Sequence, residues 1–298
     1  MRSLRRVVQA LAIAVVAIAA LLVTLGVHGY GLMFGVEHRD LLPLRVRPHA
    51  SLVARGRHLA EITCVDCHSA RHELPLAGSR QNFLHEPGGP DFGVVVAPNV
   101  TPGARIARAS DAEVGRAIRE GIGFDHRPLI IMPSGDYRSL SDRDLAALVA
   151  YLRSQPAVAD TPSVRRFTPL AFLVLGAQAF ETSLQRPVTR PVPALAEAPT
   201  PQYGEYVVKI LGCATCHGAD FHGGRSPLLP RGPDLGPIVA ERSVEPFAQA
   251  LREGVGRGGR ALDPRQMPWT TFRRLTDVEV RAAFLYLRNQ TGSARPGP

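Results

Sequence analysis

The hydrophobic residues of this chain gather first in one long N-terminal run. From Val7 to Val27 there are 21 consecutive residues without a charged side chain, and Arg5 and Arg6 stand just before them. An α-helix rises about 1.5 Å per residue, so this run can cross a hydrocarbon core of roughly 30 Å. The pattern predicts one membrane-spanning helix, with residues 1–29 as a membrane anchor.

The charges that flank the run predict its orientation. Two arginines lie just before it, whereas the next arginine beyond it is Arg39. Positive side chains near a span stay on the cytoplasmic side, so we expect a cytoplasmic N-terminus and export of everything after residue 28. A cleaved signal peptide is the alternative. Its apolar region usually holds only about 7–15 residues, which favours an uncleaved anchor.

The remainder of the chain has the pattern of short amphipathic helices. Ser110 with Glu113, and Thr276 with Glu279, have the spacing of capping boxes, which satisfy free backbone amides where a helix begins. No segment outside the anchor alternates apolar and polar residues with period two, so the predicted fold class is all-α. Apolar residues recur at helical spacing in two segments: Leu145, Leu148, Val149 and Leu152, and Val280, Ala283, Phe284 and Leu287.

The same unit occurs twice in the body of the chain. Each copy contains Cys-x-x-Cys-His, then Arg-Glu-Gly, then Met-Pro, then Tyr-Leu-Arg. The Met-to-Tyr distance is 19 residues in both copies, whereas the first Cys-to-Met distance is 68 in one and 54 in the other. The longer copy has extra glycine- and proline-rich residues between Arg71 and Pro98. Because loops tolerate insertions, this pattern predicts a duplicated fold.

The repeat also predicts where the domains lie. We expect one domain over residues 50–155 and a second over residues 200–290, joined by a proline-rich linker over residues 156–199. The linker contains an apolar segment, Phe167–Phe180, that is too short to span a membrane. We expect this segment to pack on a domain face, the alternative being contact with the membrane surface.

All four cysteines belong to the two Cys-x-x-Cys-His motifs. One helical turn with this spacing presents two thiols to the two vinyl groups of a porphyrin, and the adjacent histidine supplies an axial ligand to iron. The motifs therefore predict two covalently bound haem c groups. Their residues are Cys64, Cys67 and His68 in the first motif and Cys213, Cys216 and His217 in the second.

A zinc site and a thioredoxin-like redox pair are the rival interpretations of these cysteines. Zinc would need four converging ligands, and each repeat would then be expected to supply a second Cys or His pair. A redox pair does not require a histidine after the second cysteine, and it would lie in a βαβ pattern that this sequence lacks. Both alternatives are weaker than haem attachment.

The second axial ligand of each iron is predicted by elimination among four methionines. Met1 begins the chain and Met33 lies outside the repeats, whereas Met132 and Met267 occupy the same place in each repeat and both precede proline. Proline fixes the backbone where a loop must hold a thioether against iron. His/Met ligation closes both axial positions and raises the reduction potential, which favours electron transfer over catalysis.

Several other side chains are weaker candidates for haem contacts. His126 and His222 could be alternative ligands or could contact propionates. Arg127 and Arg260 lie in the loops before the two methionines and could pair with propionates. Tyr137 and Trp269 could pack on a haem edge, and a surface or core role is the alternative for all six.

The charge of the chain is basic but does not indicate nucleic-acid binding. The formal net charge is +9, and almost all of the positive charge is arginine, with Lys209 the only lysine. These arginines are scattered among acidic residues, and aromatic residues are few, so no basic stripe is formed.

Further motifs suggest a family resemblance over most of residues 50–290. The chain resembles the cytochrome c subunits of bacterial membrane-bound alcohol, gluconate and sorbitol dehydrogenases. It differs from that pattern in having two haem motifs where three are typical, and an N-terminal rather than C-terminal hydrophobic segment. The motifs that carry the resemblance are Ala97-Pro98-Asn99-Val100-Thr101-Pro102, Arg119-Glu120-Gly121, Met132-Pro133, Leu140-Ser141-Asp142 and Ala150-Tyr151-Leu152-Arg153.

The resemblance implies a carrier with no substrate of its own. Such a subunit takes electrons from a periplasmic dehydrogenase and passes them to the respiratory chain, through quinone or another acceptor. It implies thioether bonds at the four cysteines, axial ligands at His68, Met132, His217 and Met267, and haem domains on the periplasmic side of a bacterial inner membrane. The alternatives are a dihaem subunit of a cbb3-type oxidase and a dihaem peroxidase-like enzyme.

Overall fold

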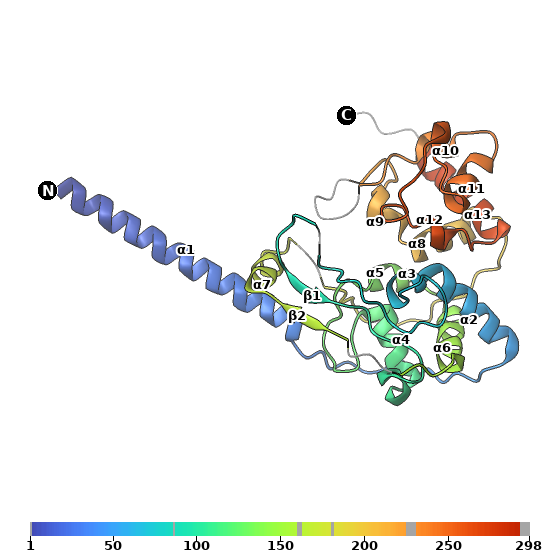
Figure 1. Ribbon diagram of the computed structural model, residues 1–298, viewed down its shortest axis with the longest axis horizontal. Coiled ribbons are helices and arrows are strands. Elements are labelled where there is room, and N and C mark those ends of the chain that lie inside the picture. The colour runs from blue at the N-terminus through green and yellow to red at the C-terminus, as the bar shows by residue number, and fades with distance from the viewer. Residues whose placement is uncertain (1, 86, 160–162, 180–181, 225–230, 293–298) are drawn as a thin grey trace.

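A computed structural model describes residues 2–85, 87–159, 163–179, 182–224 and 231–292. The described chain is mostly helical, with a long N-terminal helix that projects from a body of two helical units (Figure 1). The anchor and first unit contain α1 (Arg2–Phe34), α2 (Ala50–Thr63), α3 (Val65–His68), β1 (Gly93–Val95), a 3-10 turn (Arg105–Arg108), α4 (Asp111–Glu120), α5 (Ser134–Tyr137) and α6 (Asp142–Ser154). The connection and second unit contain β2 (Arg165–Phe167), α7 (Pro169–Gly176), α8 (Pro201–Ile210), α9 (Cys213–His217), α10 (Gly236–Val239), α11 (Glu245–Arg252), a 3-10 turn (Arg257–Gly259), α12 (Trp269–Phe272) and α13 (Asp277–Gly292).

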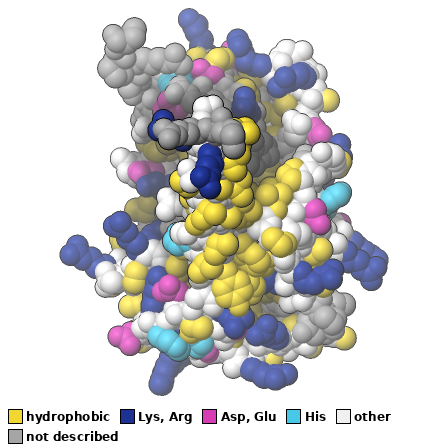
Figure 2. Space-filling model, turned by 90° about the vertical axis from the view of Figure 1, so that its left-hand side faces the viewer, with side chains coloured by type: hydrophobic (Ala, Val, Ile, Leu, Met, Phe, Trp, Pro, Cys, Tyr) yellow, Lys and Arg dark blue, Asp and Glu magenta, His cyan; other side chains and the backbone are white. Residues whose placement is uncertain are grey.

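Helix α1 confirms a single long apolar helix at the N-terminus. Within the described residues, the segment Ser3–Phe34 is the one helix long and apolar enough to cross a membrane. Most of its large hydrophobic side chains are exposed, as Figure 2 shows from the side on which α1 lies. It continues for about five residues past the predicted limit of the anchor at Gly29.

The two units are built around the same helix crossing. Helix α2 packs on α6, and α8 packs on α13. A Cβ atom added to Gly56 would lie 1.8 Å from the Ala147 carbonyl oxygen, and one added to Gly204 would lie 1.9 Å from that of Ala282. Only glycine permits so close an approach of two helix backbones, and both units use it at the same place.

The helix ends agree with the predicted capping signals. The Ser110 hydroxyl accepts from the Glu113 amide at 3.2 Å while the Glu113 carboxylate accepts from the Ser110 amide at 2.7 Å. Thr276 and Glu279 form the same reciprocal pair at 3.2 and 2.9 Å. Gly121 then ends α4 in the left-handed conformation, at φ 67°.

Two short strands add a feature that periodicity did not predict. β1 pairs antiparallel with β2, with Gly93 opposite Phe167. β1 belongs to the loop that is longer in the first unit, and β2 belongs to the connection between units. This ribbon ties the two segments together beside the C-terminal end of α1 (Figure 1).

The apolar segment of the linker packs chiefly on the anchor. Its described part forms α7, which lies against the last turns of α1; Phe180 lies outside the described residues. A Cβ atom added to Gly29 would lie 1.9 Å from the Phe172 carbonyl oxygen, and one added to Gly176 would lie 2.0 Å from that of Leu25. Because α7 also shares a small core with Ile130 and Met33, it joins the anchor to the first unit.

Candidate functional site

The first Cys-x-x-Cys-His motif forms the turn that follows α2. The Cys64 amide still bonds to the Ala60 carbonyl at 2.9 Å, and the His68 amide bonds to the Cys64 carbonyl at 2.9 Å. The buried Tyr137 hydroxyl donates to the carbonyl of Thr63 at 2.7 Å. Tyr137 belongs to α5, directly after Met132-Pro133, so the segment that follows the predicted methionine ligand packs on the attachment turn of the same unit.

The second motif forms α9. The turn opens with Gly212 in the left-handed conformation, φ 66°, and the motif ends at His217, which is buried. A Cβ atom added to Gly232 would lie 2.6 Å from Nδ1 of His217, so the backbone approaches the imidazole closely on that side.

Both histidines are oriented by a proline carbonyl. Nδ1 of His68 lies 2.8 Å from the Pro98 oxygen, and Nδ1 of His217 lies 2.8 Å from the Pro233 oxygen. A carbonyl that accepts from Nδ1–H fixes the tautomer in which Nε2 carries the free lone pair, as an imidazole ligand of iron requires. Burial also lowers the pKa of both histidines, against the opposing effect of the carbonyl, so the neutral ligand form is favoured. These residues fit the haem iron that the motifs predict.

The two proline carbonyls were not anticipated from the sequence. His68 and Pro98 are 30 residues apart, whereas His217 and Pro233 are 16 apart. The difference of 14 equals the whole difference between the Cys-to-Met spacings of 68 and 54, so the inserted residues all lie between the histidine and its carbonyl partner. Comparison of the two spacings could have identified both prolines.

Both methionines precede the same tight turn. Pro133 has φ −79° and ψ 56°, and the Ser134 amide bonds to the Met132 carbonyl at 2.8 Å. Pro268 has φ −76° and ψ 54°, and the Trp269 amide bonds to the Met267 carbonyl at 2.7 Å. These are inverse γ-turns, and proline supplies the required φ at no cost. Both methionine side chains are partly buried against the core that also includes the attachment turns.

The cysteine environment disfavours the rival chemistries. Burial raises the pKa of Cys64 to about 11, and burial raises that of Cys67 and Cys213 to about 12. Redox and zinc-binding cysteines instead need an easily formed thiolate. Among the described residues, no group of three or more His, Cys, Asp or Glu side chains is arranged to hold a metal ion.

The weaker candidates have other contacts in the structure. Arg127 lies over the Phe34 ring at 5.6 Å, and the Trp269 indole donates to the Leu262 carbonyl at 3.1 Å. The His126 ring is tilted against that of His38, with 5.3 Å between their centroids, and His222 contacts Asp234. Arg260 is exposed.

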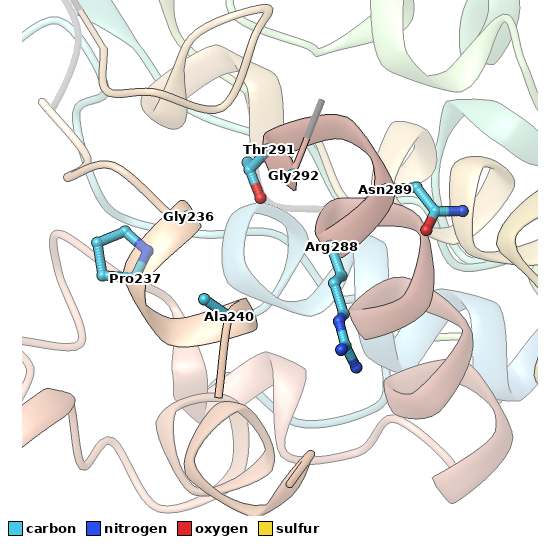
Figure 3. Close-up of a pocket in the computed structure, with 7 residues that line it drawn as sticks. All are labelled: Gly236, Pro237, Ala240, Arg288, Asn289, Thr291 and Gly292. Carbon is cyan, nitrogen blue, oxygen red and sulfur yellow. The ribbon is translucent and has the colours of Figure 1, made fainter. Parts of the chain in front are cut away.

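An open depression between α10 and the end of α13 lies apart from the predicted haem residues. None of its lining residues is one of them, and Arg288 is its charged member (Figure 3).

Comparisons with known proteins agree with the duplicated pattern. Residues 51–152 match the family model described as cytochrome c oxidase, cbb3-type, subunit III, and residues 202–291 match the cytochrome c model. The chain carries two cytochrome c domains. The two matches establish a dihaem cytochrome c with covalently bound haem c, whereas the domain limits of 50–155 and 200–290 remain predictions.

Several curated relatives of this dihaem cytochrome are subunits of dehydrogenases. It is 26% identical over 277 residues to the fructose dehydrogenase cytochrome subunit of Gluconobacter japonicus. This match covers 86% of this chain and 56% of the relative. It is 29% identical over 177 residues to the gluconate 2-dehydrogenase cytochrome c subunit of Pantoea cypripedii. That match covers 56% of this chain and 38% of the relative. A stretch of 95 residues is 32% identical to the alcohol dehydrogenase (quinone) cytochrome c subunit of Gluconobacter oxydans. This stretch covers 28% of this chain and 20% of the relative.

The relatives are longer than this cytochrome. The chain spans about half the length of the fructose dehydrogenase subunit and less of the other two. All three relatives are named as cytochrome subunits of dehydrogenases, and the two cytochrome c domains make this chain an electron-transfer protein.

Proposed function

We propose that this cytochrome is an anchored relay that takes electrons from a periplasmic dehydrogenase and passes them to the respiratory chain, through quinone or another acceptor. The observation that carries the proposal is the matched pair of sites, each with a histidine held by a proline carbonyl and a methionine held by an inverse γ-turn. The names of the relatives support a dehydrogenase as the electron donor.

The role of each site residue follows from this arrangement. Cys64, Cys67, Cys213 and Cys216 form thioether bonds to the two porphyrins. His68 and His217 would hold iron through Nε2, and Met132 and Met267 would supply the second protein ligand of each iron. Bound haem would supply a one-electron couple.

The lengths along α1 support the membrane placement. About 20 residues of helix cross a hydrocarbon core of roughly 30 Å, so a span that begins after Arg6 ends near residue 26. The packing with α7 begins at Leu25, at the end of that span. Beyond it lies an aromatic group in which Phe34 contacts Tyr30, Phe167 and Phe172. Tyrosine favours the membrane–water boundary, so Tyr30 marks the periplasmic surface, and the packing around it keeps the haem domains close to that surface.

The test is purification of the full chain in mild detergent from its native membrane. We expect two haem c per chain by pyridine haemochrome and a dehydrogenase identified among the proteins that purify with it. A second arm replaces Met267 by Ala, with Met33→Ala as the control outside the repeats. We expect Met267→Ala to alter the spectrum and lower the potential of one haem; an unchanged spectrum and potential would contradict the ligand assignment.

A second candidate function is a subunit of a cbb3-type oxidase. The family model matched by residues 51–152 favours it. The same purification decides between the two, because an oxidase would bring copper and b-type haem with the chain, and the dehydrogenase relay would not.

A further inference from the structure

The two cytochrome domains meet through equivalent elements. Helix α12, which follows Met267 in the second domain, contacts α2 of the first, and α5, which follows Met132 in the first domain, contacts α8 of the second (Figure 1). Since α5 corresponds to α12 and α2 corresponds to α8, each contact is repeated with the domains exchanged. The interface therefore has approximate twofold symmetry within one chain.

The symmetry extends to side chains at the two haem-attachment turns. Asp66 lies between Cys64 and Cys67, and its carboxylate accepts from the hydroxyl of Thr271, four residues after Met267. The equivalent of Asp66 in the second domain is Thr215, and that of Thr271 in the first is Asp136.

This second pair also meets across the interface. Asp136 and Thr215 both lie against Gly212 of the second attachment turn. A Cβ atom built on Gly212 would be 2.6 Å from Oδ2 of Asp136 and 3.8 Å from the hydroxyl oxygen of Thr215. The first domain supplies the aspartate of both pairs, from its attachment turn in one and from α5 in the other. Each attachment turn therefore touches the post-methionine helix of the other domain.

A buried polar cluster between these two contacts keeps the domains aligned. Arg55 donates to both oxygens of Asp144 at 3.0 and 2.9 Å, and the Tyr206 hydroxyl donates to Asp144 at 2.5 Å. His58 meets Glu279 at 2.9 Å, and Arg55 also lies 3.5 Å from Glu279. His58 and Tyr206 are equivalent positions, as are Asp144 and Glu279, so the cluster follows the same symmetry.

We propose that Asp66 and Asp136 are positioning residues of this crossed junction, and that each acts on both haem sites. The inference rests on the proposed attachment of haem at both motifs. Bound haem would supply a one-electron couple at each site, and electron transfer between the two would form and break no bond. Each haem-attachment turn contacts the opposite domain, so protein joins the two turns directly.

The geometry predicts the electrostatic consequence. A carboxylate stabilises nearby ferric iron, and Asp66 touches both the first attachment turn and the helix next to the second methionine ligand. Asp136 holds the reciprocal place. Removing either charge therefore raises the potentials of both haems, whereas a purely local role would raise one.

The experiment is a spectroscopic redox titration of the full chain in detergent. The variants are Asp66→Asn and Asp136→Asn, which preserve shape, and the control is Asp277→Asn, which removes an exposed carboxylate paired with Arg252 inside the second domain. The variants Met132→His and Met267→His, in separate samples, assign each redox wave to its haem, because loss of methionine ligation lowers the potential.

We expect each junction variant to shift the ferrous-to-ferric ratio of both haems by about tenfold, equal to about 59 mV for one electron. We expect the control to shift neither haem. Circular dichroism in the Soret region gives a second readout, since two haems held close together give a band with two signs. The double variant Asp66→Ala with Asp136→Ala should lose that band while far-ultraviolet dichroism is kept.

The possible results distinguish failure of the proposed junction from failure of the proposed relay function. Two haems per chain with a shift confined to one haem in each variant would overturn the junction alone, and so would a Soret band unchanged in the double variant. Fewer than two haems per chain in the unaltered protein would overturn the proposed function, and the junction with it.

Discussion

The glycine crossing in each domain makes a quantitative prediction about stability. In Gly204→Ala the new methyl group would lie 1.9 Å from the Ala282 carbonyl oxygen and 2.8 Å from the Tyr286 Cβ. Carbon contacts are favourable only from about 3.5 Å, so α8 and α13 must separate by more than about 1 Å. Overpacking of this kind costs about 1–3 kcal/mol, and a clash with backbone lies at the upper end because no side chain can rotate away.

One favourable effect opposes this cost. Replacing glycine by alanine inside a helix gains about 1 kcal/mol of helix propensity. The net loss is then about 2 kcal/mol, which for a domain of about 60–100 residues lowers the melting temperature by roughly 8–16 °C. Gly56→Ala should do the same in the first domain, since its methyl group would lie 1.8 Å from the Ala147 oxygen.

Thermal unfolding of the haem-loaded protein, followed by far-ultraviolet circular dichroism, measures the effect. The control is Gly115→Ala in α4, where the nearest atoms are the flexible ends of Leu44 and Leu145 at 3.0 and 3.2 Å. If Gly204→Ala and Gly56→Ala melted at the temperature of Gly115→Ala, the close helix approach would be refuted.

Three further predictions test other parts of the molecule. Cys216→Ala should leave one thioether at the second haem, and replacing Cys213 as well should halve the covalent haem that a denaturing gel retains. Burial alone would raise the pKa of Asp144 and Glu279, but their hydrogen bonds outweigh it and hold both pKa values below the ordinary range. The stability that these two carboxylates contribute is therefore present above the unfolded pKa and is lost as pH falls below about 4. Native-state hydrogen exchange in acid should then show the domain interface opening at a higher pH than the core of either domain. Gly176→Leu should separate α7 from α1 and make the linker more sensitive to protease, without loss of haem.

The local elements were accessible from sequence because their causes are local. The capping boxes at Ser110 and Thr276 need only four consecutive residues, and the apolar face that includes Leu148 needs only one helix. The β1–β2 ribbon was missed because each strand has three residues, too few to show a period, and the partners lie about 70 residues apart. The position of α7 on α1 was missed because it depends on Gly29, which in sequence resembles any glycine of a membrane helix.

In the candidate site, too, the sequence predicts the residues with a local signal and misses those that depend on distant contacts. The covalent motif fixes which cysteines and histidines meet one porphyrin, so sequence predicts them, and the duplicated Met-Pro pairs predict the opposite ligands. The carbonyl of Pro98 has no side-chain signal, and it becomes visible only through the matched spacing of Pro233. Contacts between domains are harder still, because Asp66 and Thr271 look like ordinary surface residues until the relative placement of the two domains is known.

The reciprocal form of the interface limits how the domains can move. Each contact joins non-identical side chains at equivalent positions: aspartate with threonine at the attachment turns, and histidine or tyrosine with a carboxylate at the centre. A slide by one helical turn would break both copies of every contact at once. Asp144 would lose Tyr206, and Glu279 would lose the cations of the other domain, His58 and Arg55. Breaking one partner of a buried charge pair costs about 3–5 kcal/mol, so such a slide is strongly disfavoured. The two haem-attachment turns are therefore held at one separation, and the N-terminal helix is tied to the same rigid arrangement because α7 joins it to the first domain.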